Sequence, residues 1–154
     1  MLHRRSFIII GAFFIFIFLS APAAMADLAM SDTIGQIKNM TGKVTILRGG
    51  QELTAKVADL LESQDTIVTG SDSSVGITFI DNSRFSLGPK SRIELTKFKF
   101  DPTTNEGEFH TTVEKGTLLI LSGQIAKESP DAMKVKTRNS ILGVRGTKFA
   151  VRVR

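Results

Sequence analysis

The sequence predicts an all-β domain, and three features carry that prediction. Beyond residue 64, short runs of β-branched and aromatic residues recur at close spacing. Turn-forming residues separate them, as in Gly70 to Ser74. In the closing run Phe149, Val151 and Val153 alternate with other residues and share one face of a strand. The only helical pattern beyond residue 26, Val57 to Glu62, is too short for more than a turn or two of helix and is expected to be a connector.

The first 26 residues have the order of a secretory signal peptide. Arg4 and Arg5 precede an apolar run from Phe7 to Leu19, and Ala24 and Ala26 supply the small residues that signal peptidase recognises. As a helix the apolar run spans roughly 20 Å, short of the ~30 Å of a bilayer core. We therefore expect a signal-peptide helix cleaved after Ala26, a periplasmic or secreted protein, and no membrane span after cleavage.

Two alternatives concern this leader. An uncleaved anchor would require residues 20–26 to lie in the membrane, and Pro22 argues against that. The pair Arg4-Arg5 resembles a twin-arginine signal, but the very apolar run that follows favours the general export route.

The composition of residues 27–154 limits the possible functions. The segment is long enough for one domain. The chain has no cysteine, which excludes disulfides and a lipid-modified N-terminal cysteine. The segment keeps 18 of the 20 Lys and Arg residues and all 15 acids, a net charge of +3. This mild charge does not predict a nucleic-acid partner.

Strand candidates follow one another along the chain. After a lead in residues 27–41, which includes the first strand, the Gly49-Gly50 turn joins two strands in a hairpin. A turn is expected at Lys115-Gly116. The predicted strands are Ile34–Met40, Lys43–Arg48, Gln51–Lys56, Thr66–Thr69, Val75–Ile80, Arg84–Leu87, Arg92–Asp101, Gly107–Glu114, Thr117–Ile125, Met133–Arg138 and a closing pair.

The hairpin between Leu95 and Val113 allows its register to be predicted. A four-residue loop from Pro102 to Asn105 pairs Asp101 with Glu106, Lys99 with Glu108, Phe98 with Phe109, and Lys97 with His110. An aromatic pair then lies on one face and an ion pair on the other. Each such cross-strand pair contributes roughly 0.2–1 kcal/mol.

Four segments in order resemble the FecR domain, a module named for the periplasmic part of iron-dicitrate sensing regulators. They are residues 65–83, 98–107, 116–130 and 137–149, within a domain of residues 42–154. The resemblance implies a rolled, solenoid-like β-domain with antiparallel or mixed strands, and a β-sandwich is the alternative. FecR regulators carry an anti-sigma region and a transmembrane helix ahead of this domain, so this chain is expected to be a standalone secreted form.

The last segment holds the most recognisable motif of that family. Its residues here are Thr137, Gly143, Arg145, Gly146 and Thr147. We expect a structural role, because Gly143 and Gly146 allow a sharp bend or a close approach to another backbone. Arg145, between them, has five donors that could satisfy carbonyl groups freed by the bend.

Catalytic and metal-binding residues are sparse. Residues 27–154 contain one histidine, His110, too few for a Ser-His-acid triad or a zinc site, and we expect it to be a solvent-facing strand residue. Ser71 to Ser73 and Asp81 to Ser83 could offer oxygen ligands to calcium, but both are better explained as turns. Glu106 and Glu108 have a glycosidase-like spacing without an implied cleft. We expect no enzyme activity, no cofactor and no metal.

The most suggestive feature is charge. Seven Lys and Arg residues and no acid follow Asp131. Lys134, Lys136, Arg138 and Arg152 are the predicted face for an anionic partner, such as a phosphate-bearing glycolipid, an acidic glycan or an acidic protein surface. The alternative is that the first three are the solvent side of a strand, paired with acids on neighbouring strands.

These observations favour a non-enzymatic binding or scaffold module of the cell envelope, with an envelope protein or glycan as partner. The periplasmic sensor part of a sigma-factor and anti-sigma system, acting through a partner, is the alternative hypothesis. A carbohydrate-active enzyme is a more distant one.

Overall fold

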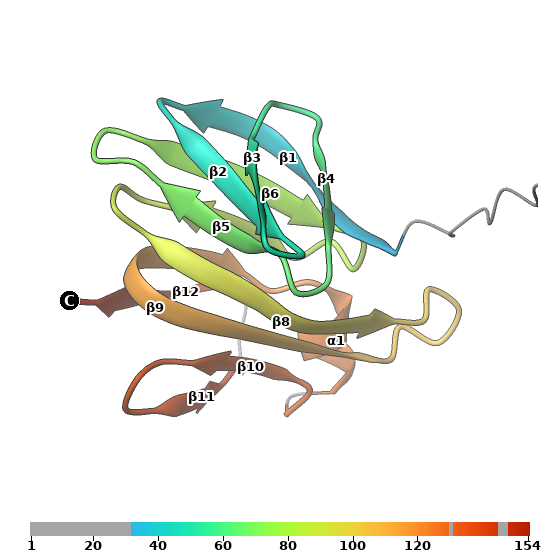
Figure 1. Cartoon of the computed structure of the whole chain (residues 1–154). Helices are drawn as coiled ribbons and strands as arrows, with labels where there is room; N and C mark the ends of the chain where they lie inside the picture. Colours follow the sequence, from blue (N-terminus) through green and yellow to red (C-terminus); the bar gives the residue numbers. More distant parts are fainter. Residues whose placement is uncertain (1–31, 130, 145–147) are drawn as a thin grey trace, which may run out of the picture.

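The computed structural model describes residues 32–129, 131–144 and 148–154, which form strands and one short helix (Figure 1). The elements are β1 (Thr33–Thr41), β2 (Val44–Arg48), β3 (Gln51–Thr54), β4 (Leu60–Glu62), β5 (Thr66–Thr69), β6 (Ser74–Phe79), β7 (Arg84–Leu87), β8 (Arg92–Phe100), β9 (Gly107–Leu121), α1 (Gln124–Glu128), β10 (Met133–Lys136), β11 (Ile141–Gly143) and β12 (Lys148–Val153).

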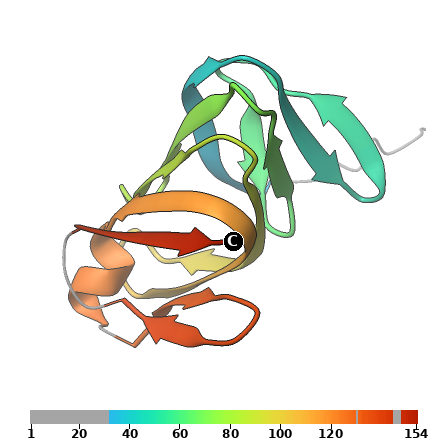
Figure 2. The ribbon, with the colours of Figure 1, turned by 90° about the vertical axis from the view of Figure 1, so that its left-hand side faces the viewer.

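The strands form one sheet that curls into an open half-barrel. Along the sheet the order is β3-β2-β5-β8-β9-β7-β6-β1-β4, and β10 and β12 both branch from β9. The pairing of β10 with β9 is parallel, whereas the other described pairs are antiparallel. Figure 2 shows β9 (orange) wrapping the lower half of the molecule, with β12 beside it and the β10–β11 hairpin below. The predicted rolled, mixed all-β fold is therefore confirmed.

The bend in β9 joins the two halves of the curl. Up to Lys115 the strand pairs with β8, and from Gly116 onward it pairs with β7 and β12. Gly116 has a φ of +93°, and a Cβ atom there would lie 2.2 Å from Ser91 Oγ. The Thr117 amide donates to that same oxygen at 3.0 Å. The prediction of a turn at Lys115-Gly116 is wrong, because β9 bends over Ser91 and continues to Leu121.

Two further predictions are corrected. Val57 to Glu62 contains strand β4, not helix, because Leu61 is buried between the exposed Leu60 and the half-buried Glu62, and β4 pairs with β1. The strand expected up to Ile125 ends at Leu121, and helix α1 follows. The helix turns Ile125 and Ala126 into the core.

The predicted hairpins are confirmed. Gly49 and Gly50, with φ of +55° and +82°, connect β2 to β3. Strands β8 and β9 have the predicted register, and the rings of Phe98 and Phe109 lie 4.8 Å apart. The ion pair is diagonal, since Glu108 contacts Lys97 at 2.5 Å instead of its direct neighbour Lys99.

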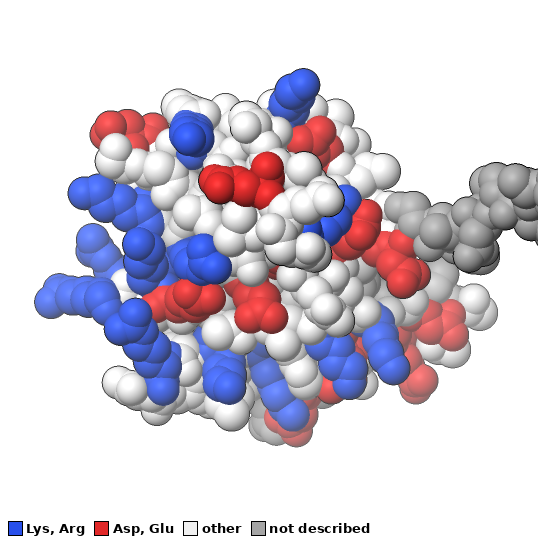
Figure 3. Space-filling view, viewed as in Figure 1, with Lys and Arg blue, Asp and Glu red and all other residues white. Residues whose placement is uncertain are grey.

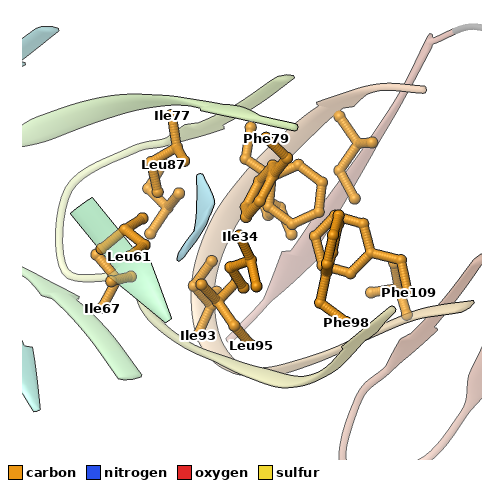
Figure 4. Close-up of a cluster of buried hydrophobic side chains, with 14 of the residues drawn as sticks. Ile34, Leu61, Ile67, Ile77, Phe79, Leu87, Ile93, Leu95, Phe98 and Phe109 are labelled. Atoms are coloured by element: carbon orange, nitrogen blue, oxygen red, sulfur yellow. The ribbon is translucent and has the colours of Figure 1, made fainter. Parts of the chain in front are cut away.

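The core fills the inside of the curl. Figure 4 shows Phe79, Phe98 and Phe109 at one end and aliphatic side chains at the other. The rings of Phe79 and Phe109 meet edge to face at 4.7 Å, and Phe85 stacks on Phe109 at 5.1 Å. Such aromatic pairs contribute about 0.5–1.5 kcal/mol beyond their buried area. Because these rings come from β6, β7, β8 and β9, they fix the two halves of the sheet against each other.

Buried carboxylates fasten two turns. Asp65 is fully buried and accepts hydrogen bonds from the Arg48 guanidinium at 2.8 and 2.7 Å. Asp81, also fully buried, accepts from the Ser83 amide and hydroxyl, and Ser83 Oγ in turn accepts from the Gly123 amide. The segment Asp81 to Ser83 is thus a turn, as predicted, and it also holds the residue before α1.

Candidate functional site

The four cations predicted to face an anionic partner lie in two places. Lys134 and Lys136 are exposed on the outer side of β10. Arg138 and Arg152 lie at the end of the molecule where β12 finishes. None of the four forms an ion pair with another described residue. The alternative, in which acids on neighbouring strands neutralise the lysines, therefore has no ion pair among the described residues to support it, although the charge of Lys134 does act on Glu108 of β9.

The β10 lysines border a hollow of about 280 Å³ on the outer face of β8, β9 and β10. Ile141, which is 67% exposed, closes one side of it, and a Thr96–Thr112 hydroxyl pair at 3.0 Å lines another. This hollow combines one apolar wall with two cations.

His110 lies in the same hollow and is less exposed than predicted, with 28% of its side chain accessible. Its Nε2 atom lies 3.1 Å from Glu108 Oε1. A hydrogen bond from Lys97, together with the charges of His110, Lys97 and Lys134, lowers the pKa of the Glu108 carboxyl. His110 thus belongs to a group of charged side chains on neighbouring strands, which we call the charged strand cluster; its members are Lys97, Glu108, His110 and Lys134.

The larger concentration of charge is at the end of β12, where two hollows lie on either side of the strand. They have volumes of about 430 and 480 Å³, and both are lined by Arg152, Val153 and Arg154. Lys90 and Lys115 line the first hollow, and Arg138 lines the second. We call this surface the basic end; its cations are Lys90, Lys115, Arg138, Arg152 and Arg154. No Asp or Glu is among the residues lining either hollow.

Backbone geometry brings these cations together. Arg152 pairs with Thr117 of β9, so the bend at Gly116 places Lys115 beside it. Arg138 is at the tip of the β10–β11 hairpin, whose turn is closed by the Thr137 amide donating to the Ser140 carbonyl at 2.8 Å. Lys90, with a φ of +51°, is in the turn before β8. Sequence reasoning missed Lys90 and Lys115, because their proximity to β12 depends on pairing between distant strands.

The space-filling view shows the charge distribution directly. Blue atoms gather on the left-hand side of Figure 3, the side where the C-terminus lies in Figure 1. Arg92 is nearby in sequence but is neutralised by Glu114 at 2.9 Å. The five cations of the basic end form no ion pair with another described residue. The end therefore presents concentrated positive charge.

The predicted family motif is described only in part. Gly143 is exposed at the end of β11, and a Cβ atom there would meet only Asp131 Oδ1 at 3.9 Å. The close approach expected at Gly143 is therefore not found. Arg145, Gly146 and Thr147 lie outside the described residues, as do Ala24 and Ala26 of the predicted cleavage site.

The described residues include neither a metal-binding cluster nor a membrane-spanning helix. Residues 32–129, 131–144 and 148–154 contain no group of three or more His, Asp or Glu side chains placed to hold a metal ion. Across the same ranges, no helix has the length and apolar character required to span a bilayer.

Comparison with known proteins identifies one family. Residues 65–154, more than half of the chain, match the family described as FecR protein. No curated protein and no solved structure matches the chain. The matched region runs from the buried Asp65 through β9 to the basic end, so it contains the bend and the strands that assemble that surface. The chain therefore belongs to the FecR family.

Proposed function

We propose that this protein is a non-catalytic binding or scaffold module of the cell envelope that recognises an anionic partner through its basic end. The observation that carries the proposal is the pair of adjoining hollows, whose described lining includes five cations and no Asp or Glu. Export by the predicted N-terminal signal peptide, into the periplasm or the medium, is part of the proposal.

The contrast with the structural arginines of the same chain supports this function. Arg48 is engaged by Asp65 and Glu62, and Arg92 by Glu114. Arg138 and Arg152 form no ion pair with a described acid, and both are exposed. Clustered cations without counter-charges raise the local concentration of an anionic partner and speed its association.

Membership of the FecR family supports a second candidate, the periplasmic sensor part of a sigma-factor and anti-sigma system. In that role the domain would act through a partner that carries the signal across the membrane. The two candidates share the same binding surface and differ in whether the partner is a signalling protein.

Binding of envelope extract to the immobilised protein, measured at several salt concentrations, tests the proposal. Replacing Lys115, Arg138 and Arg152 together by Gln should weaken capture and flatten its salt dependence. The matched control replaces Lys38, Lys56 and Lys99, which are exposed and line neither hollow, and it should leave both unchanged. Capture with the same salt dependence in both triple variants would contradict the proposal.

A further inference from the structure

We infer that the ligand of the basic end is a linear polyanionic glycan, whose successive anionic groups occupy both hollows as the chain crosses the end of β12. The inference rests on the proposed function, because it specifies the ligand of the same surface. Three features support it: the residues shared by the two hollows, the spacing of the cations, and the chemistry of the other lining residues.

The two hollows adjoin each other at the end of β12. Both are lined by Arg152, Val153 and Arg154, so a ligand leaving one hollow meets side chains that also line the next. Arg138 lies in one hollow alone, and Lys90 and Lys115 lie in the other alone. The positive charge is therefore distributed along a line, which suits a repeated anion better than a single phosphate.

The strand itself sets part of the spacing. Arg152 lies in β12 and Arg154 is the residue directly after the strand, which places their Cα atoms about 6.8 Å apart where the chain is extended. Each guanidinium presents several donors in one plane and can bind a carboxylate, sulfate or phosphate group in a bidentate manner. Two such groups at this spacing can each engage a separate anionic substituent of one polymer.

The remaining side chains fit sugar hydroxyls. The hollows are lined by hydroxyl and amide groups from Ser71, Thr117, Thr137, Asn139 and Ser140, which both donate and accept hydrogen bonds. Among the described residues no aromatic side chain lines either hollow, and the apolar lining comes from Pro89, Val151, Val153 and Leu142, of which Leu142 is 41% exposed. Protein interfaces usually rely on buried aromatic and Arg anchors, and membrane surfaces on an apolar face that inserts. The hydroxyl and amide groups, together with the lack of an aromatic anchor among the described lining residues, therefore favour a glycan over an acidic protein or a lipid surface.

The test uses the full chain and linear glycans of defined length. Calorimetric titration with galacturonate oligomers, from the monosaccharide upward, should show no measurable binding of the monomer and at least a tenfold rise in affinity with length, until both hollows are filled. A sugar-phosphate polymer in a parallel titration tells carboxylate from phosphate recognition. Binding of either polymer with this length dependence supports the inference.

Single replacements locate the ligand. Arg138→Gln removes the cation found in one hollow alone, and it should lower the affinity of a long oligomer towards that of a short one while leaving the short oligomer's affinity unchanged. The control Lys56→Gln should change neither. Equal affinity for monomer and polymer, per anionic group, would overturn the inference, and so would equally tight binding to glycan-free anionic vesicles.

One outcome separates this inference from the proposed function. If neither polymer binds but an acidic protein is captured from the envelope in a salt-dependent manner, the glycan assignment is wrong and the anionic-partner function stands. If nothing anionic binds and the triple variant of the basic end behaves as the parent does, both are wrong.

Discussion

Replacing Arg48 by Met should destabilise the domain severely, because it leaves a buried carboxylate without its main partner. Asp65 is fully buried, whereas the Arg48 side chain is 30% exposed. The guanidinium donates to both Asp65 oxygens, and these bonds are the main reason that the pKa of Arg48 is raised. Without Arg48, the described hydrogen bond left to the Asp65 carboxylate comes from the Glu62 amide at 2.8 Å.

The size of the expected destabilisation follows from the burial of the Asp65 carboxylate. Removing one partner of a buried ion pair costs about 3–5 kcal/mol, because the remaining charge is neither paired nor solvated. Against a total stability of about 5–15 kcal/mol for a domain, this is a large loss. For a domain of this size it corresponds to a fall in Tm of about 10–20 °C.

Thermal unfolding followed by circular dichroism measures the effect, with two controls. Glu62→Gln removes the partially exposed partner of Arg48 and should cost less than about 1 kcal/mol. The double variant Arg48→Met with Asp65→Asn removes both charges and should recover much of the lost Tm. If Arg48→Met melts within about 2 °C of the parent, the buried pair does not contribute as the structure indicates.

Three other predictions concern the bend in β9 and the charged strand cluster. Gly116→Val should prevent stable folding, since its Cβ would collide with Ser91 at a φ of +93°, whereas Gly143→Ala should be tolerated; equal melting temperatures would contradict this. His110→Gln should preserve both Tm and ligand binding, and loss of binding at an unchanged Tm would assign it a recognition role. The lowered pKa of Glu108 means that its pairing stabilises the fold above the usual value of 4.5 and is lost as pH falls through the lower folded value. Melts of Glu108→Gln should therefore differ slightly from the parent at neutral pH and converge with it in acid, and a constant difference would refute the linkage.

Local chemistry explains which parts of the fold could be predicted from the sequence. The β8–β9 register follows from loop length and from the pairing of Phe98 with Phe109, and both lie within a short stretch of chain. The Gly49-Gly50 hairpin is equally local, because two glycines with positive φ suit a two-residue turn. Such elements need no information from distant segments.

The errors occur where a distant residue decides the conformation. Gly116 and its neighbour Lys115 resemble a turn, but Ser91 holds the Thr117 amide and allows the strand to continue. Residues 60–62 have helical composition, yet pairing with β1 and burial of Leu61 make them a strand. Tertiary contacts thus override weak local propensity at these positions.

The same dependence explains why the basic end was predicted only in part. The cations of the last segment are visible as a run in the sequence, but Lys90 and Lys115 join them only through β9. Strand β9 pairs with β10 before the bend and with β12 after it, so one strand positions both Arg138 and Arg152. A change that straightens the bend would separate these two arginines even if every cation were retained. The basic end is therefore a consequence of the bend at Gly116, and the charges alone do not create it.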